Sequence, residues 1–387
     1  MSGAYEQPAH EPPATTGERE RRWVASGERD ITPALGKRGK PARWRRAVDG
    51  ARVNLAKQRW GDMRWSFTYQ GAGSKYQADR RERTQVPELP APEPDRIVGP
   101  MMNKPVWTWE VPLYFWFGGI AAGSSFVGLA CDLAGDHRSA QTARKVAVAA
   151  LLPSPPLLIM DLGRPARFAN MLRVFKPRSP MNMGAWCLTA FGAVGSGAVA
   201  ADLLKRRRLA RALGGLNAFL GGYLGSYTGV LLAVTAVPVW ARSRLFLGPI
   251  FVCTATATGA AAVRLVLVAT GLPAGHRTRT ALGTVETGAI VAELLLSAVN
   301  ERRLGELKGA LEEGHPGLLF RGAKIGVVTA VALRTLRARG GVAVHHVASA
   351  MYMLSGLAFR YAWVEAGKAS AADDRAVAWM SRAERNR

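Results

Sequence analysis

Apolar stretches of about twenty residues recur along the chain from Trp107 onward, and only short polar breaks separate them. Twenty helical residues rise about 30 Å, which matches the hydrocarbon thickness of a bilayer. A soluble chain of 387 residues has too small a core to hide so many of these stretches. In lipid, only helices and closed barrels satisfy the backbone polar groups, and these stretches are too long and too continuously apolar for barrel strands. We therefore predict an all-α integral membrane protein.

Eight stretches of this kind predict eight transmembrane helices. The predicted spans are 109–131, 142–160, 183–204, 213–240, 244–270, 279–299, 317–336 and 342–366. Glycines are spaced four apart in the first span, at Gly119 and Gly123, and in the fourth, at Gly221, Gly225 and Gly229. Small residues at this spacing let membrane helices approach closely. We expect the first and fourth spans to lie inside a packed bundle.

The mean hydropathy of +0.01 averages over regions of very different composition. Residues 1–104 form a basic N-terminal extension, rich in proline and charge, that we predict to be largely irregular. Its stretch 37–64 has apolar residues at helical spacing opposite basic ones, which suits a helix lying on anionic lipid or on a partner subunit. Residues 105–366 form the predicted membrane domain, and residues 367–387 form a polar C-terminal tail.

The net charge of +24 is compatible in principle with a nucleic-acid partner. Many of the basic residues, however, lie between apolar spans, where Lys and Arg commonly flank membrane helices. We therefore expect membrane lipid as a partner and no nucleic acid.

The orientation in the cell membrane depends on where the basic residues lie. The short loops divide their Lys and Arg almost evenly between the two sides of the predicted bundle. The long basic extension has no apolar export segment, and its Arg21-Arg22 pair is followed by no hydrophobic stretch. We predict a multi-pass protein of the cell (inner, cytoplasmic) membrane with the N- and C-termini both cytoplasmic.

Cysteines and histidines are too scattered to predict a metal centre. Cys131, Cys187 and Cys253 lie far apart in or beside apolar stretches, without a CxxC motif. A haem with two histidine ligands needs two facing histidines, but only His345 and His346 lie near a span, and adjacent helical residues point apart. We expect no iron–sulfur cluster, zinc or haem in this chain.

Asp161 stands at the end of the second span and is followed by Arg164 and Arg167. Charged groups in a bilayer are costly and tend to mark functional sites. The pattern predicts an ionised Asp161, paired with these arginines, that shapes the loop around a redox or ligand pocket. The alternative is a structural cap at a helix end.

Glu286 and Glu293 are seven residues apart on the sixth span and therefore share one helical face. Two acids on one face suit either a proton path or ion pairs with a neighbour such as Arg264. Tyr114 and Tyr227 carry hydroxyls that can hydrogen-bond a quinone carbonyl, although tyrosines are also common at membrane interfaces. The polar residues otherwise gather near one membrane edge.

Three segments closely resemble the NrfD-like family, the membrane subunits of polysulfide reductases, formate-dependent nitrite reductases and related complexes. They read WTWEVPLYFWFGGIAAGSS (107–125), DLGRPARFANMLRVFKPRSPMNMGAW (161–186) and YTGVLLAVTAVPVW (227–240). The second is the most specific, and the likeness covers roughly residues 105–366.

The resemblance implies a pair of four-helix bundles with no permanently bound cofactor. It implies an exchangeable quinone, menaquinone or ubiquinone, in a pocket at the membrane edge beneath a ferredoxin-like subunit that carries four-iron clusters. A molybdopterin subunit beyond it performs the substrate chemistry, on formate, polysulfide, nitrite or thiosulfate.

The resemblance also implies roles for individual residues. The functional polar positions of the family fall on Tyr114, Asp161 and Tyr227, with Glu286 and Glu293 in its acidic sixth span and Arg360 in its last span. Some relatives carry His or Asn just before the first span, where this chain has Trp107, Trp109 and Glu110. The expected quinone-binding residues are therefore Trp109, Glu110, Tyr114, Asp161, Arg164, Arg167 and Tyr227. Those expected in a proton path or ion pair are Glu286, Glu293 and Arg360.

The leading hypothesis is a quinone-binding electron-transfer subunit that performs no substrate chemistry itself. Scattered membrane acids and glycine-rich helices also suit a secondary transporter, although no internal repeat is evident. A third hypothesis is a structural anchor without a quinone site.

Overall fold

The computed structural model describes residues 100–161, 171–336 and 342–385, and all regular structure in these ranges is helical. Residues 1–99 of the basic extension, with the helix predicted in 37–64, lie outside them. The long helices are α4 (Glu110–Leu133), α5 (His137–Leu151), α8 (Pro180–Leu203), α9 (Arg207–Ala233), α11 (Leu247–Ala269), α12 (Arg277–Leu304), α14 (Gly314–Leu336) and α15 (Val342–Ala372). The shorter elements are α6 (Ser154–Asp161), α10 (Pro238–Arg242), a 3-10 turn at Gly305–Lys308, α13 (Gly309–Glu312) and α16 (Asp374–Arg385).

The second predicted span, 142–160, is interrupted, whereas we expected one helix. It consists of α5, a break at Leu152 and Pro153, and then α6. Prolines at positions 153, 155 and 156 remove three backbone donors in four residues, so an unbroken helix cannot form there. Together α5 and α6 are nevertheless long and apolar enough to cross a membrane.

The fourth predicted span, 213–240, is wrong at its C-terminal end. Helix α9 stops at Ala233, and a turn leads to the separate five-residue helix α10. Pro238 is the first residue of α10, a position where its missing N–H costs nothing, while it could not have continued α9. Trp240 therefore belongs to a short helix at the end of the bundle.

Six helical segments of the described chain are long and apolar enough to span a membrane, so the prediction of a multi-pass helical protein is confirmed. The predicted count of eight is not confirmed, because α9 and α15 do not reach this apolarity. Six glycines and Asn217 lower the mean hydropathy of α9. Histidines, serines and Arg360 do the same in α15.

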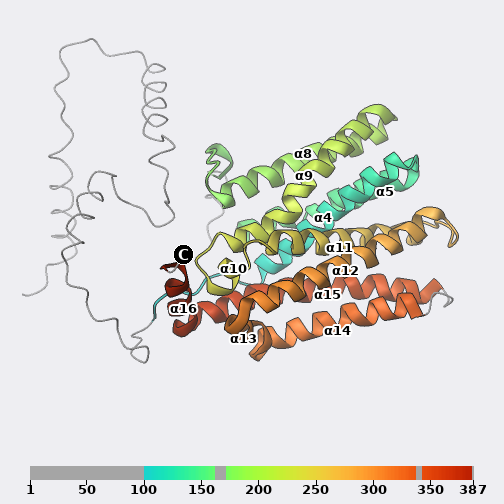
Figure 1. Ribbon diagram of the computed structural model, residues 1–387. Coiled ribbons are helices and arrows are strands. Elements are labelled where there is room, and N and C mark those ends of the chain that lie inside the picture. The colour runs from blue at the N-terminus through green and yellow to red at the C-terminus, as the bar shows by residue number, and fades with distance from the viewer. Residues whose placement is uncertain (1–99, 162–170, 337–341, 386–387) are drawn as a thin grey trace, which may run out of the picture. The chain divides into compact units, whose positions relative to one another are not determined.

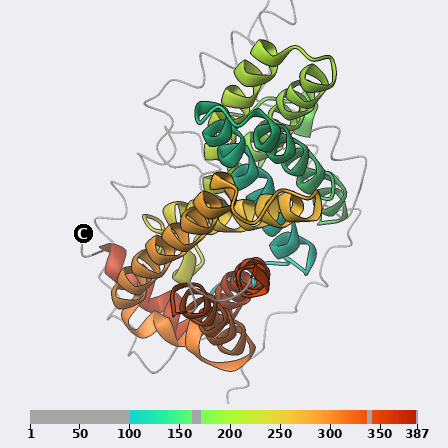
Figure 2. The same ribbon diagram turned by 90° about the vertical axis from the view of Figure 1, so that its right-hand side faces the viewer.

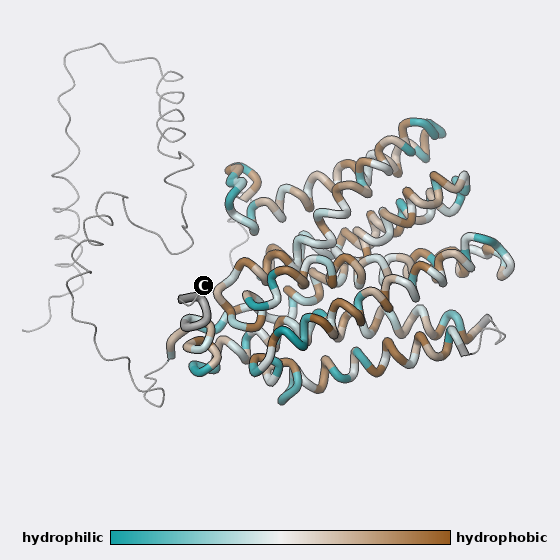
Figure 3. The backbone as a smooth tube through the Cα atoms, in the orientation of Figure 1, coloured by the Kyte–Doolittle hydropathy of each residue, from teal (hydrophilic) through white to brown (hydrophobic). Residues whose placement is uncertain are grey.

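The long helices run side by side, and successive helices point in opposite directions (Figure 1). Helices α4, α5, α8 and α9 contact one another, α11 pairs with α12, and α14 pairs with α15. Helix α11 also packs along α4, α9 and α15, and the view along the helices shows α8 and α14 far apart with α4 and α11 between them (Figure 2). Hydrophobic residues fill the middle of most helices and hydrophilic ones gather at the turns (Figure 3).

Close packing of α4 against α11 depends on glycines. A Cβ on Gly123 would overlap the backbone of Ala255, and one on Gly259 would overlap the backbone of Gly123. The small residues of α4 thus permit the approach that their spacing predicted. Helices α4 and α11 are the most buried of the candidate spans.

The alternating helices give the bundle two ends, which we name after a residue at each. At the Trp107 end lie the starts of α4, α8, α11 and α14 and the ends of α6, α9 and α15. At the Arg279 end lie the turns that join α4 to α5, α8 to α9, and α11 to α12.

Candidate functional site

A small pocket at the Trp107 end brings together residues of α4, α6, α8 and α9. Its lining is almost entirely apolar or aromatic, with two tyrosines and one carboxylate. The lining residues are Trp107, Val111, Tyr114 and Phe115 from α4 and the segment before it, Leu157, Leu158 and Asp161 from α6, Met181 and Ala185 from α8, and Tyr227 and Leu231 from α9. Concave apolar sites with few polar groups are typical of small-molecule binding.

Tyr227 owes its position to a glycine on the neighbouring helix. A Cβ on Gly184 would overlap the phenol ring of Tyr227, so only glycine leaves room for this ring between α8 and α9. Tyr223 stacks on the other side, with ring centroids 5.9 Å apart and planes inclined by 17°. The ring therefore has little freedom, and its hydroxyl is aimed by packing.

Tyr114 lies against the pocket from α4 and, like Tyr227, is about 5% exposed or less. Among the described residues, neither tyrosine hydroxyl takes part in a hydrogen bond, although buried polar groups normally find a partner. Both hydroxyls are therefore available to a ligand.

Asp161 is the last residue of α6 and places a half-buried carboxylate at the same pocket. Its predicted partners Arg164 and Arg167 lie outside the described residues, so the predicted ion pairs stay a prediction. The geometry thus joins three of the predicted quinone-binding residues, Tyr114, Asp161 and Tyr227, from three helices.

Trp109 and Glu110 do not line this pocket. Trp109 is 52% exposed at the start of α4, and its carbonyl oxygen accepts a hydrogen bond from the Tyr361 hydroxyl at 2.9 Å. The Glu110 carboxylate accepts a hydrogen bond from Thr108. The tryptophan that does line the pocket is Trp107, which the sequence marked only as part of the segment before the first span.

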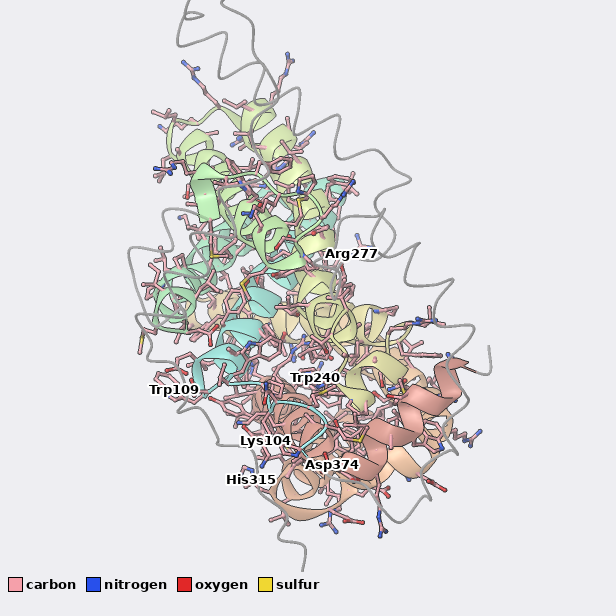
Figure 4. All side chains as sticks on the ribbon, turned by 90° about the vertical axis from the view of Figure 1, so that its left-hand side faces the viewer. Lys104, Trp109, Trp240, Arg277, His315 and Asp374 are labelled. Carbon is pink, nitrogen blue, oxygen red and sulfur yellow. The ribbon has the colours of Figure 1, made fainter. Side chains whose placement is uncertain are left out.

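Trp107 is held by aromatic contacts with α4 and with α10. Its ring stacks on Trp240 at 5.2 Å and meets Phe115 edge-on at 6.4 Å. The Trp240 indole in turn donates to the Trp363 carbonyl of α15 at 2.8 Å, and Gly367 leaves space for it. Figure 4 views this end of the molecule, with Trp109 and Trp240 labelled.

The pocket has a cavity volume of about 20 Å³, room for roughly one water molecule. A larger ring can enter only if lining side chains move. Flexible residues such as Met181 and Leu158 are the ones best able to do so.

A second group of buried polar residues lies toward the Arg279 end and centres on Glu286, which is fully buried. Its carboxylate lies 2.8 Å from Arg334 Nη2 and 3.9 Å from Arg264 Nη1, and it accepts a hydrogen bond from Ser349 at 2.8 Å. Arg264 was the partner expected from the sequence, whereas Arg334 was not foreseen.

Glu293, about two helical turns further along α12 on the same face, has different surroundings. It accepts a hydrogen bond from Ser297 at 2.6 Å and borders a small cavity with Lys324. No described Lys, Arg or His lies within 4.0 Å of its carboxylate. Arg360 is 1% exposed, donates to the Phe251 carbonyl at 3.1 Å and covers the Phe251 ring, so it forms no direct pair with Glu293.

Sequence reasoning missed a buried ion triad at the Arg279 end. Arg144 of α5 lies 2.5 Å from Asp132 of α4, and it binds Asp202 of α8 through Nε at 2.6 Å and Nη2 at 2.9 Å. Each residue stands at a span end, where a charge is unremarkable, and only the packing of three helices brings them together. The interpretation that polar residues gather at one edge is therefore wrong.

The described residues contain no group of three His, Cys, Asp or Glu placed to hold a metal ion. No curated protein matches the chain. The model of one protein family, described as Polysulphide reductase, NrfD, matches residues 98–371. This match spans well over half of the chain, from the segment before α4 to the last turn of α15, and includes every residue of the pocket. The chain therefore belongs to the NrfD polysulphide reductase family of membrane subunits.

Proposed function

We propose that this chain is the quinone-binding membrane anchor of an iron–sulfur/molybdopterin oxidoreductase. It passes electrons between the quinone pool and a ferredoxin-like partner that carries four-iron clusters. The observation that carries the proposal is the convergence of Tyr114, Asp161 and Tyr227, from three helices, on one apolar pocket. Membership of the family supports the same function.

The pocket residues have complementary chemical roles in this proposal. Reduction of a quinone to a quinol takes up two electrons and two protons, and the reverse reaction releases them. The hydroxyls of Tyr114 and Tyr227 donate hydrogen bonds to the quinone oxygens and fix the ring in the slot. Asp161 is the last residue of α6, and in this proposal its carboxylate exchanges a proton with the quinone and with water.

The electrons enter or leave at the Trp107 end, where we place the iron–sulfur partner. Exposed apolar residues lie there outside the pocket, at Val106, Trp109, Val174 and Phe175. Clustered apolar exposure at a membrane edge suits a protein interface. A molybdopterin subunit beyond this partner performs the substrate reaction.

The topology that goes with this function has eight membrane crossings, with α9 and α15 completing the six apolar spans. Each of the two has the length of a membrane span and packs against neighbouring spans. Glycine-rich and polar faces are tolerated in a membrane when they face other helices. Eight crossings place both termini on one side of the membrane, and we propose that this side is the cytoplasm.

A proton path along α12 extends the proposal. Glu286, Glu293 and Glu301 are all buried on this helix, as are Ser297 and Asn300. Glu286 is engaged with two arginines and favours ion pairing. Among the described residues Glu293 is bound only by Ser297, which makes it the better proton carrier.

The same buried polar residues of α12 also suit the rival function of a secondary transporter, since intramembrane acids line ion pathways in such proteins. A purely structural anchor is the other rival. Purification of the tagged chain from its native membrane separates the three. A quinone-linked subunit retains an iron–sulfur protein, and the complex oxidises a quinol. Recovery of the chain without an iron–sulfur protein would contradict the proposal and favour a transporter. A complex that contains the iron–sulfur protein but does not oxidise quinol would favour a purely structural anchor.

A further inference from the structure

An open cleft of about 520 Å³ lies at the Arg279 end, between α11, α12, α14 and the first turn of α15. It is on the opposite side of the bundle from the quinone pocket. Three arginines line it, Arg264, Arg279 and Arg334, each from a different helix and each at most 8% exposed. Arginines this deeply buried are rare unless something compensates their charge.

The protein satisfies these arginines only in part. Arg264 and Arg334 donate through their terminal nitrogens to the His345 carbonyl and the Ser349 hydroxyl, and Arg334 also donates to the Gly283 carbonyl. Arg279 donates to the Leu272 carbonyl. The Nε atom of all three is buried without a hydrogen-bond partner. Buried donors normally find partners, and these three find none among the described residues, so the guanidinium groups around the cleft are not fully satisfied there.

The balance of charge in the cleft also favours a bound anion. Glu286 is the one described carboxylate within 4.0 Å of these guanidinium groups, and it approaches Arg264 and Arg334 but not Arg279. Three positive charges against one negative charge leave an excess of two at the boundary of the bilayer. An excess of this kind is costly to bury, and an anion in the cleft would remove the cost.

Hydroxyl groups complete the lining. Thr280, Thr284 and Thr287 follow one another at helical spacing on the cleft side of α12, and the first two are exposed. Guanidinium groups with hydroxyls around them are the usual ligands of a tetrahedral phosphate, because several donors converge on its oxygens.

We propose that this cleft is a binding site for a phosphate group, carried either by an anionic phospholipid headgroup or by free phosphate. The cleft lies at the end of the membrane-spanning helices, where lipid headgroups are expected, and basic pockets between membrane helices are known to take anionic lipids. Arg279 is the main ligand, since it has no acidic partner within the described residues. The site is independent of the quinone function proposed above.

Binding is tested on the delipidated full-length chain in neutral detergent, purified with any subunits it retains. Phosphatidylglycerol, phosphatidylcholine and inorganic phosphate are titrated separately, and bound lipid is counted by native mass spectrometry. Thermal stabilisation reports phosphate binding. A preference for phosphatidylglycerol identifies the lipid source, and saturation by inorganic phosphate without lipid preference identifies the free ion.

Two variants move the affinity in opposite directions, so a folding defect cannot imitate the result. Arg279→Gln keeps an amide donor for the Leu272 carbonyl and weakens binding at least about tenfold, the factor expected from losing a charge-assisted hydrogen bond. Glu286→Gln raises the local positive charge and tightens binding severalfold. Arg277→Gln, an exposed change two residues from Arg279, is the matched control and leaves the affinity as it was. Absence of binding by all three probes, or equal weakening by Arg277→Gln and Arg279→Gln, overturns the proposal.

Discussion

Gly184 of α8 lies so close to the ring of Tyr227 of α9 that no larger residue fits there without moving the ring. We predict that Gly184→Ala displaces the Tyr227 hydroxyl from the quinone pocket and lowers quinol-linked turnover at least tenfold. Geometric errors of about 1 Å at a reacting group have effects of about a hundredfold, so the estimate is conservative. Turnover in membranes, normalised to subunit content, measures the effect.

The control is Gly222→Ala on α9, where a Cβ meets no atom within 4 Å. It removes a helical glycine as well, so it gains about the same helix propensity, up to about 1 kcal/mol, without touching the ring. Unchanged turnover in Gly184→Ala would mean that Tyr227 does not position the quinone.

Asp161→Asn keeps the size of the pocket carboxylate but removes its charge and its ability to exchange a proton. We expect quinone-linked turnover to be abolished while the partner subunits stay active with an artificial electron acceptor. Quinol-dependent rates are compared with subunit content in the same membranes. Loss of the assembled complex would instead assign Asp161 a structural role, and near-normal quinol turnover would exclude it from the site.

Asp202→Asn breaks the buried triad by leaving Arg144 with Asp132 as its only carboxylate partner. Removing one member of a buried ion pair typically costs about 3–5 kcal/mol. We predict a clearly lowered melting temperature of the detergent-solubilised chain, or a loss of folded protein. The exposed change Arg208→Gln, at the start of α9, should stay within about 0.5 kcal/mol of the wild type. An Asp202→Asn variant as stable as this control would show that the triad contributes nothing net.

Asp136 caps α5 and ties the α4–α5 turn to the start of α12. Its carboxylate accepts hydrogen bonds from the Ser139 amide and from Thr278. Burial tends to raise its pKa, but these hydrogen bonds and nearby His276 outweigh burial, so the pKa lies below the ordinary value. The stabilisation is therefore complete above the ordinary carboxyl pKa, about 4, and is lost as pH falls through the lower folded-state pKa.

The pH dependence gives this prediction its test. Asp136→Asn should melt at a lower temperature than the wild type at neutral pH, and the two melting temperatures should converge below about pH 4. A difference that persists unchanged into acid would exclude the ionised carboxylate as the stabilising group.

The membrane orientation is tested with single cysteines and an impermeant maleimide in intact cells. Ser26→Cys in the N-terminal extension should be protected if the extension is cytoplasmic. Gly275→Cys, in the exposed α11–α12 turn at the opposite end, should be labelled. The unsubstituted chain is the background, since its three cysteines lie within helices. Labelling of Ser26→Cys with protection of Gly275→Cys would reverse the orientation.

The positions of the helices were predictable because apolar stretches of membrane length are a local property of the chain. The breaks at Pro153 and before Pro238 lie within such stretches, and hydropathy does not register a missing backbone donor. Proline chemistry would have found both of them.

The candidate site was predictable only in part. Tyr114, Asp161 and Tyr227 were found through family-like segments, and the structure brings them to one pocket. The Arg144 triad and the Arg279 cleft depend on contacts between helices distant in sequence. The spacing of residues along one helix does not reveal that Arg144 will face two carboxylates, or that Arg279 will face none among the described residues.

Trp107 belongs to the pocket wall and also stacks on Trp240, whose indole is bonded to α15. A ligand that shifts Trp107 must therefore disturb its stack with Trp240, which is hydrogen-bonded to α15. If a ligand moves Trp240 in this way, a change in the fit of α15 against Trp240 must in turn change the affinity for that ligand. This indole pair therefore links the wall of the slot directly to the backbone of α15.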